Sequence, residues 1–199
     1  MTEVGAGVWV TAGPYPPGPD LPLDRAAAYG LAGARAAEFL AGRRALRALL
    51  RAVLPDAADT PIVSTGRGRP TLAGRPATGV SVSHDAGTVA VAAAVNRRVG
   101  VDVQHPPDTV AAGLLRRCLG PRATLLAGLP PADAAREFAW VWTVQEACVK
   151  ADGTGLAGRP WAVEVPPYPR AGQWRGYRWR SLREVSDVPL AVAHTEEER

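Results

Sequence analysis

The chain has 199 residues, of which 47% are hydrophobic and 21% charged, as in an ordinary globular protein of one domain or of two small halves sharing a core. No run reaches the roughly 18 consecutive apolar residues of a membrane-spanning helix, and there is no basic start followed by an apolar run, so we expect a cytoplasmic protein without a membrane segment. The formal net charge of +4 favours an anionic partner and leaves nucleic acid, a phosphate-bearing ligand and an acidic protein open.

The first part of the chain predicts a strand, a helical stretch and three more strands. Residues 7–11 form a short strand pattern. Apolar residues at helical spacing predict helix over about residues 24–54, where Pro55 ends it and internal glycines leave open one helix or two. Strands are expected at residues 80–83, 88–95 and 99–103, with links short enough for an antiparallel meander.

The second part predicts helices over about residues 109–126 and 132–151, the latter stopped by Gly153. Closing strands are expected at residues 161–165, 177–185 and 190–194. Both parts combine helix with short antiparallel strands, although no sequence repeat aligns them.

The strand at residues 99–103 carries oxygen ligands on one side. Side chains alternate along a strand, so Asp102 and Gln104 face away from Val101 and Val103. Oxygen donors on a rigid edge suit a hard cation such as Mg²⁺. A merely solvated aspartate is the alternative.

The helix over residues 132–151 places Glu146 and Lys150 one turn apart at the margin of an apolar stripe. A surface ion pair would explain this spacing equally well. Lys150 is, however, the only lysine among 23 basic residues, which indicates a position where an arginine cannot serve, such as a proton transfer. Gln145 lies inside the apolar stripe, where a buried amide needs hydrogen-bond partners.

Ser83 and His84 follow one another where a strand enters a turn. Adjacent strand residues point apart and no Gly-x-Ser-x-Gly motif is present, which disfavours hydrolase chemistry. A histidine beside a phosphate or a half-exposed histidine are both open. The glycine-rich segment that contains Arg69 is not a Walker loop and indicates only that an anion could dock there.

In order, Gly-Arg-Pro, Val-Ser-Val-Ser-His, Val-Gly-Val-Asp-Val-Gln and Phe-Ala-Trp-Val-Trp-Thr-Val-Gln-Glu-Ala-Cys-Val-Lys resemble the motif series of the surfactin-type 4'-phosphopantetheinyl transferases. The resemblance spans roughly residues 68–156. Each motif alone is weak, but their order and spacing are specific.

The resemblance implies an α+β fold, a monomeric pseudo-dimer of two similar α+β halves with the active site and coenzyme A in the cleft between them. We expect the halves at residues 1–104 and 105–199. Two positions depart from the family pattern, because Gln104 replaces the usual glutamate and Gln145 a frequent lysine. By resemblance, the metal ligands are Asp102, Gln104 and Glu146, the active-site lysine is Lys150, the coenzyme A contacts include Ser83, His84 and Arg69, and one of Arg35, Arg43 and Arg44 contacts a phosphate.

The function expected from this resemblance is Mg²⁺-dependent transfer of 4'-phosphopantetheine from coenzyme A to a serine of an apo acyl or peptidyl carrier protein, releasing 3',5'-ADP. Glu146 would take the serine proton, directly or through water, and Lys150 would neutralise or protonate the leaving phosphate. The net positive charge suits an acidic carrier. One alternative is a coenzyme A-binding relic that has lost catalysis, which the two glutamines make conceivable. The other is a nucleic-acid-binding module, which the arginines disfavour because they are spread along the whole chain.

Overall fold

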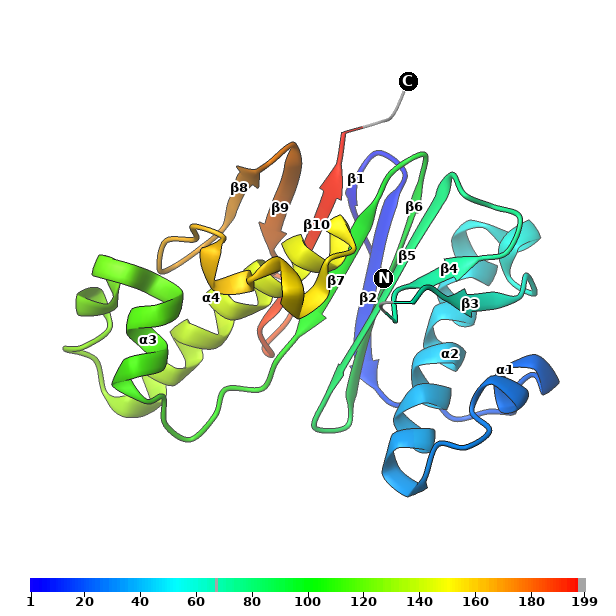
Figure 1. Ribbon diagram of the computed structural model, residues 1–199, viewed down its shortest axis with the longest axis horizontal. Helices are drawn as coiled ribbons and strands as arrows, with labels where there is room; N and C mark the ends of the chain where they lie inside the picture. Colours follow the sequence, from blue (N-terminus) through cyan, green and yellow to red (C-terminus); the bar gives the residue numbers. More distant parts are fainter. Residues whose placement is uncertain (67, 197–199) are drawn as a thin grey trace.

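The computed structural model describes residues 1–66 and 68–196. Two four-stranded antiparallel sheets meet in the middle of the molecule, and one long helix covers the outer face of each (Figure 1). The first sheet has the order β1-β2-β6-β5 and the second the order β7-β10-β9-β8. The predicted α+β fold of two similar halves is confirmed.

The first half contains two α-helices, which is one of the two possibilities that the sequence left open. The chain turns at Gly30, whose φ of 86° is rare for residues with side chains, and the second helix ends before Pro55. The elements are β1 (Thr2–Gly5), β2 (Val8–Pro14), α1 (Pro22–Ala27), α2 (Gly33–Val53), the 3₁₀ helix η1 (Pro55–Ala57), β3 (Ile62–Ser64), β4 (Pro70–Leu72), β5 (Thr78–Asp85) and β6 (Thr88–Val95).

The second half begins with a strand and contains the longest helix. This helix starts with a proline in its first turn and ends at Gly153, which has a φ of 78°. The elements are β7 (Val99–Val103), α3 (Ala112–Leu119), η2 (Gly120–Leu125), α4 (Pro131–Asp152), η3 (Gly155–Gly158), η4 (Pro160–Ala162), β8 (Ala171–Trp174), β9 (Tyr177–Ser181) and β10 (Leu190–Thr195).

The halves repeat one strand–helix–strand–strand unit. In the first half the unit is β2-α2-β5-β6, with the sheet order β2-β6-β5, and in the second half it is β7-α4-β9-β10, with the order β7-β10-β9. The two long helices therefore occupy equivalent places on the outer faces of the two sheets (Figure 1).

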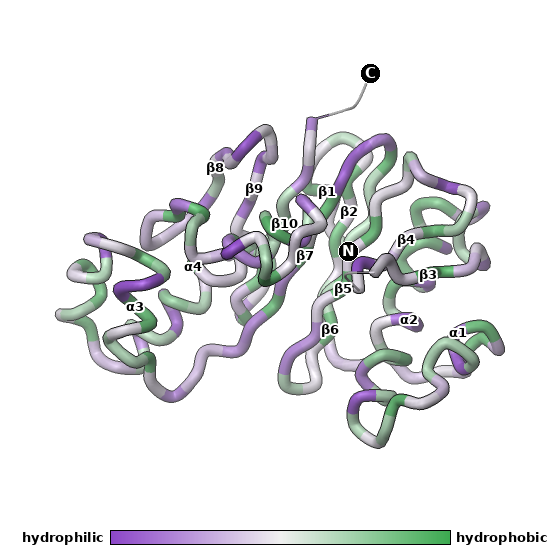
Figure 2. The backbone as a smooth tube through the Cα atoms, in the orientation of Figure 1, coloured by the Kyte–Doolittle hydropathy of each residue, from purple (hydrophilic) through white to green (hydrophobic). Residues whose placement is uncertain are grey.

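Strand β6 lies between two hydrophobic cores of the molecule. Its side chains alternate, so Val89, Val91 and Ala93 pack toward α2, while Ala90, Ala92 and Ala94 pack toward the second sheet. Valines of β7 meet these alanines in a core shared by both halves. Figure 2 shows hydrophobic stretches on the strands at the centre of the molecule and hydrophilic residues on many of the outer loops.

Three sequence-based expectations about strands need correction. The meander is wrong at its third strand, because β7 pairs with β10, with Asp102 opposite Ala191, and not with β6. The two sheets thus divide the chain between β6 and β7 rather than after residue 104. Residues 161–165 are not a strand: Val163 and Val165 are buried, but Pro160 on one side and Pro166 on the other remove ladder N–H groups. The strand expected at residues 177–185 ends at Ser181.

Candidate active site

Lys150 on α4 contacts two residues that come from different sheets. Its Nζ donates hydrogen bonds to Asp102 Oδ1 at 2.6 Å and to Ser83 Oγ at 3.0 Å. The Ser83 hydroxyl in turn donates to Asp102 Oδ1 at 2.7 Å. The Asp102 side chain is only 7% exposed, so this ion pair is much less screened than one on the surface. The lone lysine therefore lies where α4, β5 and β7 meet.

The edges of the two sheets meet through side chains at this point. Strand β5 is an edge of the first sheet and β7 an edge of the second. The Val101 N–H donates to Ser81 Oγ at 3.0 Å, and the Val103 N–H lies 3.4 Å from Ser83 Oγ. Serine hydroxyls thus satisfy backbone groups at the free edge of β7 and join the two sheets.

Gly100 allows α4 to lie close against β7. It shares one face of the strand with Asp102, and a Cβ at this position would come within 2.1 Å of the Ala147 carbonyl oxygen and 2.4 Å of the Ala151 nitrogen. The small residue therefore positions the helix so that the Asp102 side chain meets Glu146 and Lys150.

Glu146 lies one helical turn before Lys150 and is 9% exposed. Its Oε1 has no hydrogen-bond partner among the described residues. Burial, followed by the nearby Asp102 carboxylate, raises the pKa of Glu146 to about 7, against the opposing effect of Lys150, which lowers it. A buried carboxylate oxygen without a partner is costly and indicates a missing ligand or proton.

Within residues 1–66 and 68–196, no group of three or more His, Cys, Asp and Glu side chains is arranged to hold a metal ion. The third expected ligand, Gln104, is an amide and is not one of these residue types. Gln104 is half-buried just after β7, and its Nε2 lies 3.2 Å from the His105 carbonyl oxygen and 3.5 Å from Asp85 Oδ2. Two carboxylates and an amide remain an oxygen-rich set that suits Mg²⁺.

A cavity of about 180 Å³ lies between α2 and β5 and is lined by Arg43 and His84. Arg43 is 5% exposed, stacks on the Phe39 ring at 4.7 Å, and its Nη1 has no hydrogen-bond partner among the described residues. Burial lowers the pKa of Arg43, but an arginine stays charged at neutral pH. An unpartnered buried guanidinium is suited to an anion.

The other two arginines expected on α2 differ from Arg43. Arg35 is exposed in the first turn. Arg44 is neutralised by Asp20, with 2.5 Å between Nη1 and Oδ1, and its Nε donates to the Pro16 carbonyl. Of the three, Arg43 is the one that lines the cavity.

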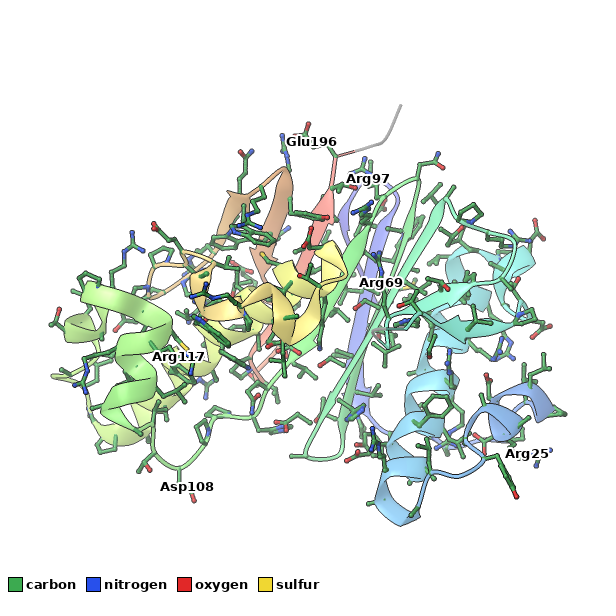
Figure 3. All side chains as sticks on the ribbon, in the orientation of Figure 1. Arg25, Arg69, Arg97, Asp108, Arg117 and Glu196 are labelled. Atoms are coloured by element: carbon green, nitrogen blue, oxygen red, sulfur yellow. The ribbon has the colours of Figure 1, made fainter. Side chains whose placement is uncertain are left out.

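A second cavity, of about 170 Å³, adjoins the first and connects it to Lys150. Both cavities are bordered by Gly68, Pro70 and Val82, and the second is also lined by Arg69 and Lys150. Arg69 lies centrally between the two halves (Figure 3). Its Nε is buried without a hydrogen-bond partner in the described chain, and burial, followed by the nearby Arg98, lowers its pKa. Basic side chains therefore extend from His84 and Arg43 through Arg69 to Lys150.

Two family models match the chain. The model for the 4'-phosphopantetheinyl transferase superfamily matches residues 98–192, and the model for the 4'-phosphopantetheinyl transferase N-terminal domain matches residues 26–94. The chain belongs to the 4'-phosphopantetheinyl transferase superfamily.

Each of the two family models matches one half of this transferase. The gap between the two models falls between β6 and β7, where the chain passes from one sheet to the other. A comparison with individually curated proteins found no match. Among the described residues of the transferase, no helix is long and apolar enough to cross a membrane.

Gln145, the second departure from the family pattern, does not face the site in this transferase. It is completely buried, and its Nε2 donates to the carbonyls of Cys118 at 2.8 Å and Val163 at 2.9 Å. The amide therefore holds the last turn of α3 and the segment just after η4 against α4. Its position in the apolar stripe was the signal that a buried amide with partners lies here.

Proposed function

We propose that the protein transfers 4'-phosphopantetheine from coenzyme A to a serine of an apo acyl or peptidyl carrier protein and depends on a divalent cation such as Mg²⁺. The observation that carries this proposal is the convergence of Asp102, Glu146 and Lys150 beside cavities lined by Arg43, His84 and Arg69. Carboxylates that can hold a metal ion lie next to basic side chains that can bind phosphates, as phosphoryl transfer requires.

Asp102 and Glu146 would hold the cation, with Gln104 as a third oxygen donor. The unpartnered Oε1 of Glu146 supports this assignment, because a cation would supply the interaction that the described residues do not. When bound, the ion offsets negative charge on the phosphates. Asp102 faces the Lys150 ammonium at 2.6 Å, so one cationic charge already offsets this carboxylate.

Glu146 and Lys150 have different tasks in the proposed reaction. Glu146 accepts the proton of the carrier serine, directly or through water. The serine oxygen bonds to the β-phosphorus of coenzyme A, and the bond from that phosphorus to the bridging oxygen breaks. Lys150 stabilises the charge that develops on the leaving 3',5'-ADP.

Arg43, His84 and Arg69 are proposed to bind the nucleotide end of coenzyme A. Buried, unpartnered guanidinium nitrogens on Arg43 and Arg69 support this role. Ser83 is already engaged by Asp102 and Lys150, so its contribution is to orient these two groups. Arg35 is exposed and Arg44 is paired with Asp20, so these two arginines are proposed to contact coenzyme A only at the rim of the cavity.

The test is incubation with coenzyme A, Mg²⁺ and a purified apo carrier protein, followed by intact-mass measurement of the carrier. We expect a gain of one phosphopantetheine group that requires the metal and is lost in Glu146→Gln. A protein that binds coenzyme A but modifies no carrier of the fatty-acid, polyketide or nonribosomal-peptide type would instead support the inactive relic. Binding of duplex or single-stranded nucleic acid without coenzyme A binding would support the third alternative.

A further inference from the structure

Gln104 replaces the glutamate usual in the family, and its role as a cation ligand rests on the proposed function. The Gln104 N–H donates to the Pro189 carbonyl at 3.1 Å, so the pairing of β7 with its neighbour extends one residue beyond the strand. Strand alternation then places Gln104 on the same face as Asp102. A glutamine here keeps an oxygen donor and lacks the negative charge of a glutamate.

The neighbours of the Gln104 amide determine which of its two ends faces them. The His105 carbonyl oxygen and Asp85 Oδ2 lie 3.2 Å and 3.5 Å from Nε2. A backbone carbonyl and an ionised carboxylate only accept hydrogen bonds. Rotating the amide by half a turn would place Oε1 against two oxygens, so Nε2 belongs on this side and Oε1 is the end left for another donor or a cation.

Asp85 is itself firmly held between the two halves. It ends β5, while its Oδ2 accepts the His105 N–H at 2.6 Å and lies 3.2 Å from His105 Nδ1. His105 Nε2 lies 3.5 Å from Thr88 Oγ1 on β6. The carboxylate thus has a fixed place directly behind the Gln104 amide.

We propose that Asp85 is a positioning residue for the cation site, which orients the Gln104 amide so that Oε1 serves as a ligand and adds from behind the negative charge that the amide lacks. Outer groups that hydrogen-bond to a metal ligand orient it and raise its donor strength. A carboxylate behind a neutral amide also attracts the cation electrostatically.

The experiment measures Mn²⁺ binding to the metal-free full-length protein by calorimetry and by electron paramagnetic resonance, with and without coenzyme A. The variants are Asp85→Asn, Gln104→Glu and the double variant. Asp85→Ser is measured in parallel, because a serine hydroxyl also accepts a backbone N–H while carrying no charge. Glu184→Gln is the matched control, since it neutralises an exposed carboxylate that pairs with Arg170.

In the wild-type background we expect Asp85→Asn and Asp85→Ser to weaken Mn²⁺ binding by about tenfold, as loss of an outer partner does. Binding of coenzyme A in the presence of a chelator should not change, and Glu184→Gln should behave like the wild type. In the Gln104→Glu background the same Asp85 substitutions should weaken Mn²⁺ binding much less, because no amide needs orienting and only the electrostatic attraction of Asp85 is lost.

A purely structural role for Asp85 makes a different prediction. It would lower the melting temperature in both backgrounds, and its effect on Mn²⁺ binding would not depend on which residue stands at position 104. Unchanged Mn²⁺ affinity in the Asp85 variants, or equal weakening in both backgrounds, would overturn the inference while leaving the transferase proposal intact. A wild-type protein that binds no Mn²⁺ even with coenzyme A would overturn both.

Discussion

Gly100 on β7 lies directly against Ala147 on α4, with no room for a methyl group between strand and helix: a Cβ on Gly100 would come within 2.1 Å of the Ala147 carbonyl oxygen. This contact fixes how far Glu146 and Lys150 on α4 lie from Asp102 on β7. The family resemblance accounts for the motif around Gly100, and the packing explains why the residue must be so small.

Gly100→Ala should therefore separate the helix from the strand. We expect a loss of about 1–3 kcal/mol in unfolding free energy from overpacking, with a larger loss of transfer activity because the carboxylates move apart. Urea unfolding and carrier modification measure the two effects. Gly113→Ala on α3 is the control, because a Cβ there meets nothing within 4 Å and alanine favours helix.

Arg43→Gln should weaken coenzyme A binding without destabilising the fold. The guanidinium is buried with Nη1 unpartnered in the described chain, so neutralising it removes a desolvation cost in the free protein and a phosphate partner in the complex. Calorimetric titration with coenzyme A in a chelator measures the affinity. Arg35→Gln, on the exposed first turn of the same helix, should bind almost normally; a comparable loss in both variants would argue against Arg43 as the phosphate contact.

Lys150→Gln should reduce turnover by about a hundredfold or more, the usual effect of removing a group that stabilises developing charge. Asp102 loses its cationic partner at 2.6 Å and keeps the Ser83 hydroxyl, so the metal-free protein should also unfold at lower temperature. Added Mg²⁺ should recover part of that stability, because a cation can again face Asp102. Full turnover in the variant would remove Lys150 from the mechanism.

The pKa of Glu146 predicts a pH dependence of stability in the metal-free protein. Its folded value of about 7 exceeds the ordinary 4.5, so the folded state binds the proton more tightly than the unfolded state. The resulting stabilisation is complete below about pH 4.5 and is lost as the pH rises to 7, amounting to at most about 3 kcal/mol. Urea unfolding in a chelator should show this slope in the wild type, and Glu146→Gln should remove it.

Gln145→Lys, which restores the residue frequent in the family, should destabilise this protein. The side chain is fully buried and donates to the Cys118 and Val163 carbonyls, and a lysine would bring an unpaired charge into that place. We expect a loss of more than about 2 kcal/mol, measured by thermal and urea unfolding. Gln145→Glu, which keeps the shape but replaces the amide donors with acceptors, should be similarly unstable.

Local pattern predicted the helices better than the strand partners. The helix expected at residues 132–151 is observed at Pro131–Asp152, because its apolar stripe and its end at Gly153 are both local signals. The pairing of β7 with β10 was missed because it joins residues nearly ninety positions apart. Hydrophobic periodicity within a segment predicts a strand but not the strand with which it pairs. The repeat of the two halves was predicted only coarsely, because the start of the second unit at β7 depends on the same long-range pairing.

The candidate site shows the same division between local and long-range information. Asp102, Glu146 and Lys150 were identified by type and spacing, and the structure brings their side chains together. Arg43 could not be separated from Arg44 by sequence, because the difference depends on Asp20 in a distant loop. Likewise, Asp85 was not singled out, since its position behind Gln104 arises only when β5 and β7 meet.

The serine hydroxyls that join β5 to β7 leave the two halves without a continuous backbone ladder. A cut in the turn between β6 and β7 would break no sheet, yet Arg43, Ser83 and Asp85 would remain on one fragment and Asp102, Glu146 and Lys150 on the other. Each fragment would also expose its part of the shared valine and alanine core, and burial of this apolar surface would favour reassociation of the fragments. Recovered activity in a mixture of two separately inert polypeptides would then report complementation of a single active centre.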